Sequence, residues 1–313
     1  MHMKVLITSN SFGSYSKEPQ KLLENNGFEI VKNPYGRVMN EDEFSKTVED
    51  ADAIILSTDK LTRKVIDNAR KLKIVARYGS GLDNVDTDYL KKKNIILTTA
   101  AGCNSSAVAD YTIGLMIDVS RRISLLNSFS KKGQWKKKTG TDLWKSKVGI
   151  IGLGAVGKGV AQRLKGFECE IYGYDKYFDE KFCEVNKIKK ASLETIYREC
   201  DFITLHIPAL PQNNHLISKR ELEMMKPNAV LINTARASLI NDDDLFEALK
   251  RGIIFGAALD VHPNEPVIDS RFAELDNVVL TSHCAAVSMK AVNQMSLKVA
   301  KDIVDFVIKG VRV

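Results

Sequence analysis

Three side chains in the second half of the sequence are of the types that move a proton beside a reacting carbon. His283 ends the segment VVLTSH, Arg236 ends LINTAR, and Glu265 follows ALDVHPN. Histidine gains and loses protons near neutral pH, and a carboxylate beside its ring stabilises the charged form. An arginine binds a carboxylate through two parallel hydrogen bonds. A lone histidine is more often a satisfied core or surface residue, so the catalytic interpretation requires a fold that brings these groups together.

The segment KVGIIGLGAVGKGVAQRL, residues 147–164, has the glycine spacing of a dinucleotide-binding loop. Its glycines follow an apolar strand and open a helix, which is the context that this motif requires. The residues expected to bind a pyrophosphate at the free N–H groups of the helix are Gly152, Gly154, Ala155, Val156 and Gly157. A tight strand-to-helix turn without a ligand is the alternative interpretation.

The next predicted strand ends in YGYD, which places Asp175 18 residues after Gly157. An acid about 20 residues beyond the last glycine binds the ribose hydroxyls of NAD. The same carboxylate repels the 2′-phosphate of NADP, although neighbouring Lys176 weakens that repulsion. We therefore expect NAD as the cofactor.

The elements that must position these residues follow from the apolar pattern. Short apolar runs alternate with amphipathic segments, which is typical of parallel sheets covered by helices. The predicted strands are residues 4–8, 52–57, 72–77, 94–99, 147–153, 169–175, 201–207, 229–235, 253–260 and 277–283. The length of 313 residues indicates two domains.

Helix signals lie between and after these strands. Residues 104–129 predict one long helix that links the two parts of the chain. Residues 218–221 (SKRE) form a capping box, and Asn241 is expected to cap a helix that Gly252 ends. In the last segment, residues 288–309, one apolar helical face is predicted from Val292, Met295, Val299, Ile303 and Phe306.

Composition narrows the class of protein. The net charge is +7 and the pI about 9.0, with the densest lysine cluster at residues 131–140. This cluster is interpreted as a solvated face or as an attraction for acidic small molecules, and no nucleic-acid-binding motif accompanies it. Five cysteines without a CxxC pair fit a reducing compartment. We expect no metal site, no signal peptide and no membrane span, hence a cytoplasmic protein.

Taken together, the motifs GIIGLGAVG, YGYD, LHIP, MKPNAVLINTAR, GAALDV, NEP and LTSH resemble those of the D-isomer-specific 2-hydroxyacid dehydrogenases, in that family's order. The resemblance covers nearly the whole chain. It implies two doubly wound parallel-sheet α/β domains with a cleft between them. A flavodoxin-like substrate-binding domain would comprise residues 1–100 and 287–313, and a Rossmann NAD-binding domain, residues 101–286, would be inserted within it.

The resemblance also implies roles for individual residues. His283 would be the acid/base, Glu265 its carboxylate partner, and Arg236 the anchor of the substrate carboxylate. Asp260 would hold the nicotinamide amide. The cofactor cleft would be lined by His206, Pro208 and Thr234. By contrast, His262 is expected to be a loop residue, and Cys284 a packing residue.

The segment RYGSGLDNVD, residues 77–86, most resembles the phosphoglycerate dehydrogenase branch. Successive N–H groups around Gly79, Ser80 and Gly81 would form an anion nest for the substrate carboxylate. Arg77 is the candidate for contact with a substrate phosphate, with a domain-interface ion pair as the alternative. D-3-phosphoglycerate is therefore the expected substrate. Asp110 and the segments ARAS (235–238) and HCAAVS (283–288) depart from the branch's usual Glu, ARGG and HIGAST, which keeps the choice open.

Two alternatives remain at this stage. The chain could reduce glyoxylate, hydroxypyruvate or another 2-oxo acid with the same chemistry, or act as an NAD-sensing binding protein of the corepressor type. The resemblance further implies a homodimer, with residues 104–129 and 134–145 at the interface. The C-terminal regulatory extension of longer phosphoglycerate dehydrogenases is not expected, nor is feedback through it.

Overall fold

The structure, a computed structural model, describes residues 3–307 and residue 310. The chain divides into two compact units. Unit 1 comprises Met1–Asn104 and Val287–Val313, and unit 2 comprises Ser105–Ala286. Unit 2 is thus inserted into the chain of unit 1, and it begins at Ser105 rather than at the predicted residue 101.

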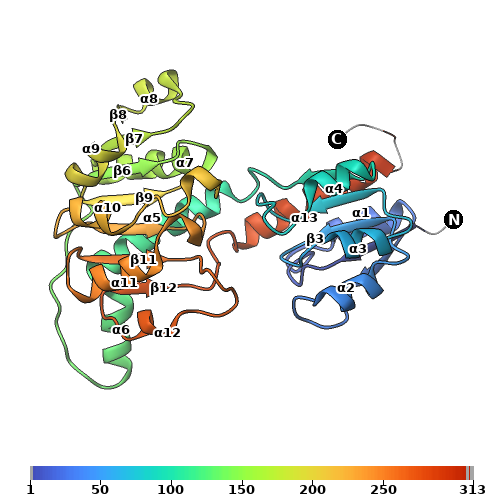
Figure 1. Cartoon of the computed structure of the whole chain (residues 1–313), viewed down its shortest axis with the longest axis horizontal. Helices are drawn as coiled ribbons and strands as arrows, with labels where there is room; N and C mark the ends of the chain where they lie inside the picture. Colours follow the sequence, from blue (N-terminus) through green and yellow to red (C-terminus); the bar gives the residue numbers. More distant parts are fainter. Residues whose placement is uncertain (1–2, 308–309, 311–313) are drawn as a thin grey trace. The chain divides into compact units, whose positions relative to one another are not determined.

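Unit 1 is a five-stranded parallel sheet with helices on both faces (Figure 1). Its strands are β1 (Met3–Ile7), β2 (Phe28–Lys32), β3 (Ala53–Leu56), β4 (Ile74–Arg77) and β5 (Ile96–Thr99). Its helices are α1 (Glu18–Asn25), α2 (Glu41–Thr47), α3 (Arg63–Asn68), α4 (Thr87–Lys92) and α13 (Met289–Val307). The strand order β2-β1-β3-β4-β5 is that of flavodoxin-like folds, as predicted.

Helices pack against both faces of the unit 1 sheet and form an apolar core on each face. On one face, α1 and α13 pack against the strands through residues such as Leu23, Val299 and Ile303. On the other face, α2, α3 and α4 contribute Phe44, Val65 and Leu90, among others. The predicted apolar face of the last helix is confirmed, because Val292, Met295, Val299 and Ile303 are all buried.

Unit 2 is a seven-stranded parallel sheet, also covered on both faces. Its strands are β6 (Lys147–Ile151), β7 (Glu170–Tyr174), β8 (Lys189–Lys190), β9 (Phe202–Leu205), β10 (Val230–Asn233), β11 (Gly256–Leu259) and β12 (Val278–Leu280). Its α-helices are α5 (Ser105–Arg121), α6 (Ile123–Lys131), α7 (Ala155–Leu164), α8 (Glu180–Val185), α9 (Leu193–Glu199), α10 (Lys219–Met224), α11 (Asp242–Lys250) and α12 (Ser270–Ala273). Short 3₁₀ turns lie at Lys165–Phe167, Pro211–Asn213 and Ala237–Leu239.

The strand order in unit 2 is β12-β11-β10-β9-β6-β7-β8. It reverses direction between β6 and β9, which is the switch point of the Rossmann fold. In open sheets of this kind ligands bind outside the carboxyl ends of the strands at that point. The carboxyl ends of β6, β7 and β9 to β12 are therefore where the candidate residues have to be sought.

The linking helix is shorter than predicted. Residues 104–129 form two helices, α5 and α6, because Arg122 between them adopts a left-handed conformation with φ 54°. Asp118 accepts a hydrogen bond from the backbone N–H of Ser124 at 2.7 Å, which satisfies the start of α6. The prediction of one continuous helix is therefore wrong.

The other sequence signals mostly agree with the structure. Each predicted strand overlaps an observed one, and the capping box at Ser218 and the Asn241 cap are both present. Strands β2 and β8 were missed. Both lie at the edge of their sheets, where only Phe28 of β2 and neither residue of β8 is buried.

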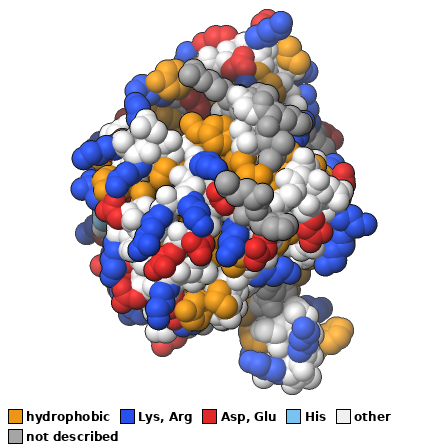
Figure 2. Space-filling model, turned by 90° about the vertical axis from the view of Figure 1, so that its right-hand side faces the viewer, with side chains coloured by type: hydrophobic (Ala, Val, Ile, Leu, Met, Phe, Trp, Pro, Cys, Tyr) orange, Lys and Arg blue, Asp and Glu red, His pale blue; other side chains and the backbone are white. Residues whose placement is uncertain are grey.

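On the face drawn in Figure 2, lysine and arginine side chains lie among acidic and hydrophobic ones. Within the part of the chain that the structure describes, no helix is both long and apolar enough to cross a membrane.

Candidate active site

The glycine loop joins β6 to α7 at the switch point of unit 2. Gly152 has a φ of 102°, a value that L side chains rarely adopt, and a Cβ on it would lie 2.6 Å from the His206 carbonyl carbon. A Cβ on Gly157 would lie 1.9 Å from the Gly152 oxygen. These two glycines therefore permit the tight turn and the close packing of helix on strand.

Gly154 differs, because nothing lies within 4 Å of the position its Cβ would take. It precedes Ala155, the first residue of α7, and the first amides of a helix have no acceptor within the helix. The N–H groups of Ala155 and Val156 are therefore available to a ligand at the positive end of the helix dipole. This cradle fits the pyrophosphate of a dinucleotide.

Asp175 lies just beyond the end of β7 beside this loop. Its Oδ2 accepts the Leu153 N–H at 2.6 Å, and its Oδ1 accepts the Tyr177 N–H at 2.7 Å. The carboxylate thus ties the glycine loop to the β7 turn. A carboxylate oxygen has two lone pairs, so each oxygen keeps one acceptor position that a ligand can use.

Three further predicted cofactor residues lie on the carboxyl side of β9 and β10. The backbone N–H of His206 donates to Ile151 O at 2.7 Å, and the ring Nε2 of His206 lies 2.9 Å from the Thr204 hydroxyl. Burial lowers the pKa of His206 to about 3, so this ring is neutral. Thr234 Oγ1 contacts Thr112 of α5 at 3.2 Å. Pro208 is exposed on the loop after β9.

The predicted catalytic residues follow three adjacent strands. Arg236 comes after β10, Glu265 after β11 and His283 after β12, and these strands pair in parallel with one another. His283 Nδ1 lies 2.8 Å from Glu265 Oε2. The imidazole–carboxylate pair is partly exposed, with 43% of the histidine side chain and 36% of the glutamate side chain accessible.

The loop after β11 holds Glu265 in place for this contact. Its second oxygen, Oε1, accepts the His262 N–H at 3.1 Å, and the ring of His262 contacts Thr281 O at 2.8 Å through Nε2. His262 therefore ties the glutamate loop to the segment before His283. The sequence interpretation recognised His262 as a loop residue but missed this contact.

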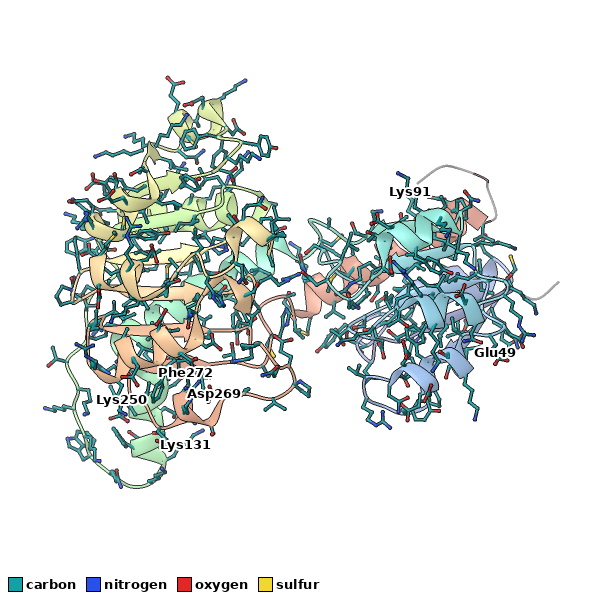
Figure 3. All side chains as sticks on the ribbon, in the orientation of Figure 1. Glu49, Lys91, Lys131, Lys250, Asp269 and Phe272 are labelled. Atoms are coloured by element: carbon teal, nitrogen blue, oxygen red, sulfur yellow. The ribbon has the colours of Figure 1, made fainter. Side chains whose placement is uncertain are left out.

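Helix α12 returns the chain from Glu265 to β12. Asp269 accepts the Arg271 N–H at 3.0 Å and begins the helix, while Phe272 is buried in the unit 2 core. The Phe272 ring, labelled in Figure 3 together with Asp269, meets that of Phe246 on α11 edge-on, and the ring centroids are 5.9 Å apart. This packing fixes the position of α12 between Glu265 and β12. The chain therefore returns to the same edge of the sheet, and His283 lies beside Glu265, 18 residues earlier in the sequence.

Asp260 lies beneath the histidine loop and is fully buried. Its Oδ1 accepts the Thr281 hydroxyl at 2.5 Å and the Cys284 N–H at 2.8 Å, and its Oδ2 accepts the Ala285 N–H at 2.9 Å. The loop turns sharply here, because His283 itself has a φ of 54°. The protein contacts of Asp260 are thus with the histidine loop, and its contact with the nicotinamide amide, which the family resemblance implies, stays a prediction.

Arg236 is positioned by a residue that the sequence interpretation did not select. Asn233, at the end of β10, donates from Nδ2 to Arg236 O at 2.8 Å and accepts the Ala235 N–H at 3.0 Å. It is 1% exposed. The sequence signal that could have identified Asn233 is an asparagine at the end of an apolar strand, three residues before Arg236.

The predicted substrate loop belongs to unit 1 and follows β4. Gly79 has a φ of 147°, and its carbonyl accepts the Ala100 N–H at 3.0 Å. Arg77 donates to Gly81 O at 2.8 Å and to Tyr78 O at 2.9 Å. Its guanidinium thus lies against its own loop.

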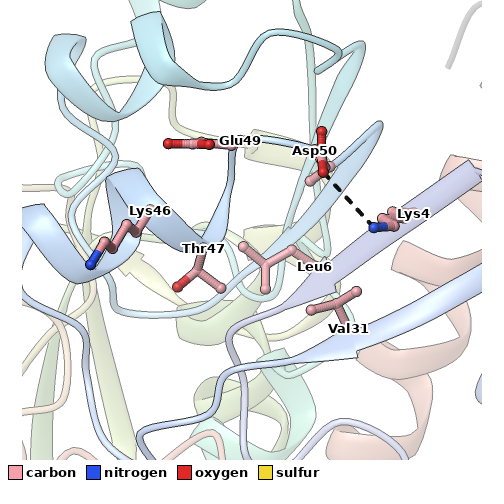
Figure 4. Close-up of a pocket in the computed structure, with 8 residues that line it drawn as sticks. Lys4, Leu6, Val31, Lys46, Thr47, Glu49 and Asp50 are labelled. Carbon is pink, nitrogen blue, oxygen red and sulfur yellow. Dashed lines mark ion pairs between the residues drawn. The ribbon is translucent and has the colours of Figure 1, made fainter.

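A pocket of about 190 Å³ lies elsewhere in unit 1 (Figure 4). Its lining includes Lys4, Lys46, Glu49 and Asp50, and Lys4 pairs with Asp50 at 4.0 Å. It contains none of the predicted site residues. Within residues 3–307, no group of three or more His, Cys, Asp or Glu side chains is arranged to hold a metal ion.

The fold and the site define a dinucleotide-binding oxidoreductase with an imidazole–carboxylate pair. Residues 113–285 match the family described as D-isomer specific 2-hydroxyacid dehydrogenase, NAD binding domain. The chain belongs to this family. Its cofactor is NAD, held in unit 2.

Relatives found by sequence carry two different names, and a solved structure carries a third. The chain is 37% identical to a D-3-phosphoglycerate dehydrogenase of Methanocaldococcus jannaschii over 96% of its length but only 57% of the relative's. It is 35% identical to a glyoxylate reductase of Thermococcus litoralis, over 98% of this chain and 94% of that one. The structure of D-lactate dehydrogenase from Escherichia coli has 27% identity and a TM-score of 0.88, covering 99% of this chain and 98% of that chain.

Proposed function

We propose that the chain is an NAD-dependent D-2-hydroxyacid dehydrogenase in which His283 is the acid/base and Glu265 its partner. The observation that carries the proposal is the 2.8 Å contact between His283 Nδ1 and Glu265 Oε2 at the carboxyl edge of the unit 2 sheet. An ion pair that only stabilises the fold could lie anywhere on the surface, whereas a proton-transfer site has to lie at this edge, beside the cofactor.

The pair assigns a role to each ring nitrogen. A carboxylate only accepts hydrogen bonds, so the Nδ1 hydrogen is directed at Glu265 and Nε2 is left as the proton acceptor of the neutral ring. During oxidation of a 2-hydroxy acid, Nε2 takes the hydroxyl proton, and Glu265 stabilises the resulting imidazolium. During reduction the same nitrogen returns that proton. When bound, NAD supplies the acceptor for the hydride that leaves C2.

Two groups are proposed to bind the substrate carboxylate. One is the guanidinium of Arg236, which can make paired hydrogen bonds to a carboxylate and polarise the neighbouring C2 carbonyl. Asn233 holds the backbone from which this side chain extends. The other is the loop of residues 79–81: its Gly79 N–H donates to Arg77 O, and the N–H groups of Ser80 and Gly81 are proposed to form the anion nest. Unit 1 is accordingly the proposed substrate-binding domain.

For the substrate itself we propose D-3-phosphoglycerate. Support comes from RYGSGLDNVD in the substrate loop and from the 37% identity to a phosphoglycerate dehydrogenase. Glyoxylate is the second candidate. One specific observation favours it: the chain is also 35% identical to a glyoxylate reductase over 98% of its own length.

The deciding experiment is a substrate panel followed by NADH absorbance. Purified protein is assayed with 3-phosphohydroxypyruvate, hydroxypyruvate and glyoxylate, each with NADH and with NADPH. We expect the highest kcat/KM with 3-phosphohydroxypyruvate and NADH. Higher kcat/KM with glyoxylate would replace the substrate proposal. NADH binding without turnover on any 2-oxo acid would indicate a cofactor-sensing protein instead.

The same assay tests the acid/base. His283→Ala should reduce kcat by roughly 10²–10⁴-fold, the usual contribution of a positioned proton-transfer group. The affinity for NADH, measured by its fluorescence, should change little, because the glycine loop is untouched. Unchanged turnover would remove His283 from the mechanism.

We also propose a second copy of the chain as partner and the cytoplasm as location. Helix α6 has no buried residue, and Trp135 and Trp144 on the segment after it are 92% and 59% exposed. Large apolar side chains at this exposure are typical of an interface. Sedimentation should give a dimer, and Trp135→Ala with Trp144→Ala should weaken it. All five cysteines are free thiols, which fits a reducing compartment.

A further inference from the structure

The guanidinium of Arg77 is engaged by backbone carbonyls of unit 1. Its Nε donates to Gly81 O at 2.8 Å. Its Nη1 donates to Tyr78 O at 2.9 Å and to Leu56 O, at the end of β3, at 3.3 Å. Three of the five N–H donors of this side chain are thus used to join the substrate loop to itself and to the neighbouring strand.

The contacts of Arg77 fix the Tyr78–Gly79 and Gly81–Leu82 peptide planes of the loop, and a contact of Ala100 fixes the plane between them, Gly79–Ser80. In a trans peptide the C=O and the following N–H point in opposite directions. Because Gly81 O faces Arg77, the Leu82 N–H points away from it. Because Gly79 O accepts the Ala100 N–H at 3.0 Å, the Ser80 N–H points away from the end of β5. No acceptor in the described part of the chain contacts the N–H of Ser80 or Gly81.

Gly79 leaves space for the guanidinium of Arg77 beside the loop. A Cβ at this position would lie 3.2 Å from Arg77 Nη1 and 3.5 Å from Cζ. Its φ of 147° is also outside the range of ordinary side chains. The glycine therefore gives the guanidinium room to lie against the loop, and the guanidinium in turn holds the loop carbonyls.

We propose that Arg77 is a positioning residue that shapes the carboxylate-binding loop, and that it does not select for a substrate phosphate. The inference rests on the proposed function, in which residues 79–81 bind the substrate carboxylate. Every 2-oxo acid carries that carboxylate. Loss of Arg77 should therefore weaken phosphorylated and unphosphorylated substrates by the same factor, whereas loss of a phosphate ligand would weaken only the former.

The test compares Arg77→Ala and Arg77→Lys with Arg70→Ala, which removes an exposed arginine of the same unit. KM and kcat are measured for 3-phosphohydroxypyruvate, hydroxypyruvate and glyoxylate. In Arg77→Ala we expect KM to rise roughly 10-fold or more for each substrate, equal within about two-fold, since several hydrogen bonds to the loop are lost. The affinity for NADH and the kinetics of Arg70→Ala should match those of the parent.

Arg77→Lys separates shape from charge. The ammonium keeps the positive charge but lacks the planar fork that reaches three carbonyls, so KM should stay raised for all three substrates. Recovery of the parent KM in Arg77→Lys, or a KM rise confined to the phosphorylated substrate, would overturn the inference.

Gly79→Ala provides the test if Arg77→Ala does not fold. Its Cβ displaces the guanidinium from the loop, and a uniform rise in KM is again expected. A rise confined to the phosphorylated substrate would count against the inference here too. A parent protein that turns over none of the 2-oxo acids would instead overturn the proposed function, and this inference with it.

Discussion

Asp260 accepts a hydrogen bond at 2.8 Å from the backbone N–H of Cys284, the residue that follows His283. It also accepts the N–H of Ala285 and the hydroxyl of Thr281. The buried carboxylate thus holds both sides of the turn in which His283 has a left-handed backbone. Single residues in this conformation cost about 1–2 kcal/mol, so the turn needs such support.

The first prediction follows from this arrangement. In Asp260→Asn one carboxylate oxygen becomes an NH₂ group that faces a donor, so at least one loop hydrogen bond is replaced by a repulsive contact. We expect the free energy of unfolding to fall by about 1–3 kcal/mol and kcat to fall because His283 moves relative to Glu265. Urea denaturation and steady-state assays measure the two effects. Asp142→Asn, at an exposed aspartate in unit 2, is the control. Equal stability and kcat in both variants would show that Asp260 does not hold the loop.

Glu265→Gln tests the other half of the imidazole contact. Glutamine keeps the size and the hydrogen-bonding ability of the side chain but removes the charge that stabilises an imidazolium. We expect kcat to fall roughly 10–10³-fold, while stability changes by less than about 1 kcal/mol, because the pair is partly exposed. Stopped-flow measurement of NADH oxidation isolates the chemical step. A parent-like rate of NADH oxidation in Glu265→Gln would show that the carboxylate does not contribute to the chemical step.

The sequence was most informative where side chains and strand ends decide the structure. Runs such as DAIILS and AVLINTA predicted buried parallel strands, and parallel strands bring their carboxyl ends to one edge. That is why Arg236, Glu265 and His283 could be grouped although 47 residues separate the first from the last. The glycine loop was predictable for a similar reason, since its spacing and its context on a strand and a helix occur together.

The rest depended on backbone groups, which residue identities do not reveal. Asp260 contacts two amide N–H groups, and Arg77 contacts three carbonyls, so neither role could be read from residue types. The break after α5 depends on Asp118 reaching the N–H of Ser124, six residues away, once Arg122 has turned. Strand β2 was missed because an edge strand with one buried residue has little apolar signal.

The glycine loop allows cofactor binding to be separated from folding. Gly154→Ala adds a methyl group where no protein atom lies within 4 Å, so the folded protein should keep its melting temperature. The methyl group would occupy the approach of the pyrophosphate, and we expect the Kd for NADH to rise at least about 10-fold. Gly166→Ala is the matched control, because its Cβ also meets nothing but lies outside the loop.

Gly157→Ala should behave in the opposite way. Its Cβ would lie 1.9 Å from Gly152 O, so α7 must move away from β6 and stability should fall. Thermal melting in the absence of NADH distinguishes the two variants. Equal NADH affinity in Gly154→Ala and Gly166→Ala would contradict the assignment of this loop to the cofactor.

His206 gives a prediction about pH. Burial lowers its pKa to about 3, compared with about 6.5 for a histidine in an unfolded chain. Between these values the unfolded chain binds a proton that the folded protein does not, so the free energy of unfolding falls as the pH drops from about 6.5 toward 3. His206→Gln removes this titration, and its urea midpoint should fall less than that of the parent between pH 7 and pH 5. An identical slope in the parent and in His206→Gln would show that His206 does not titrate on unfolding.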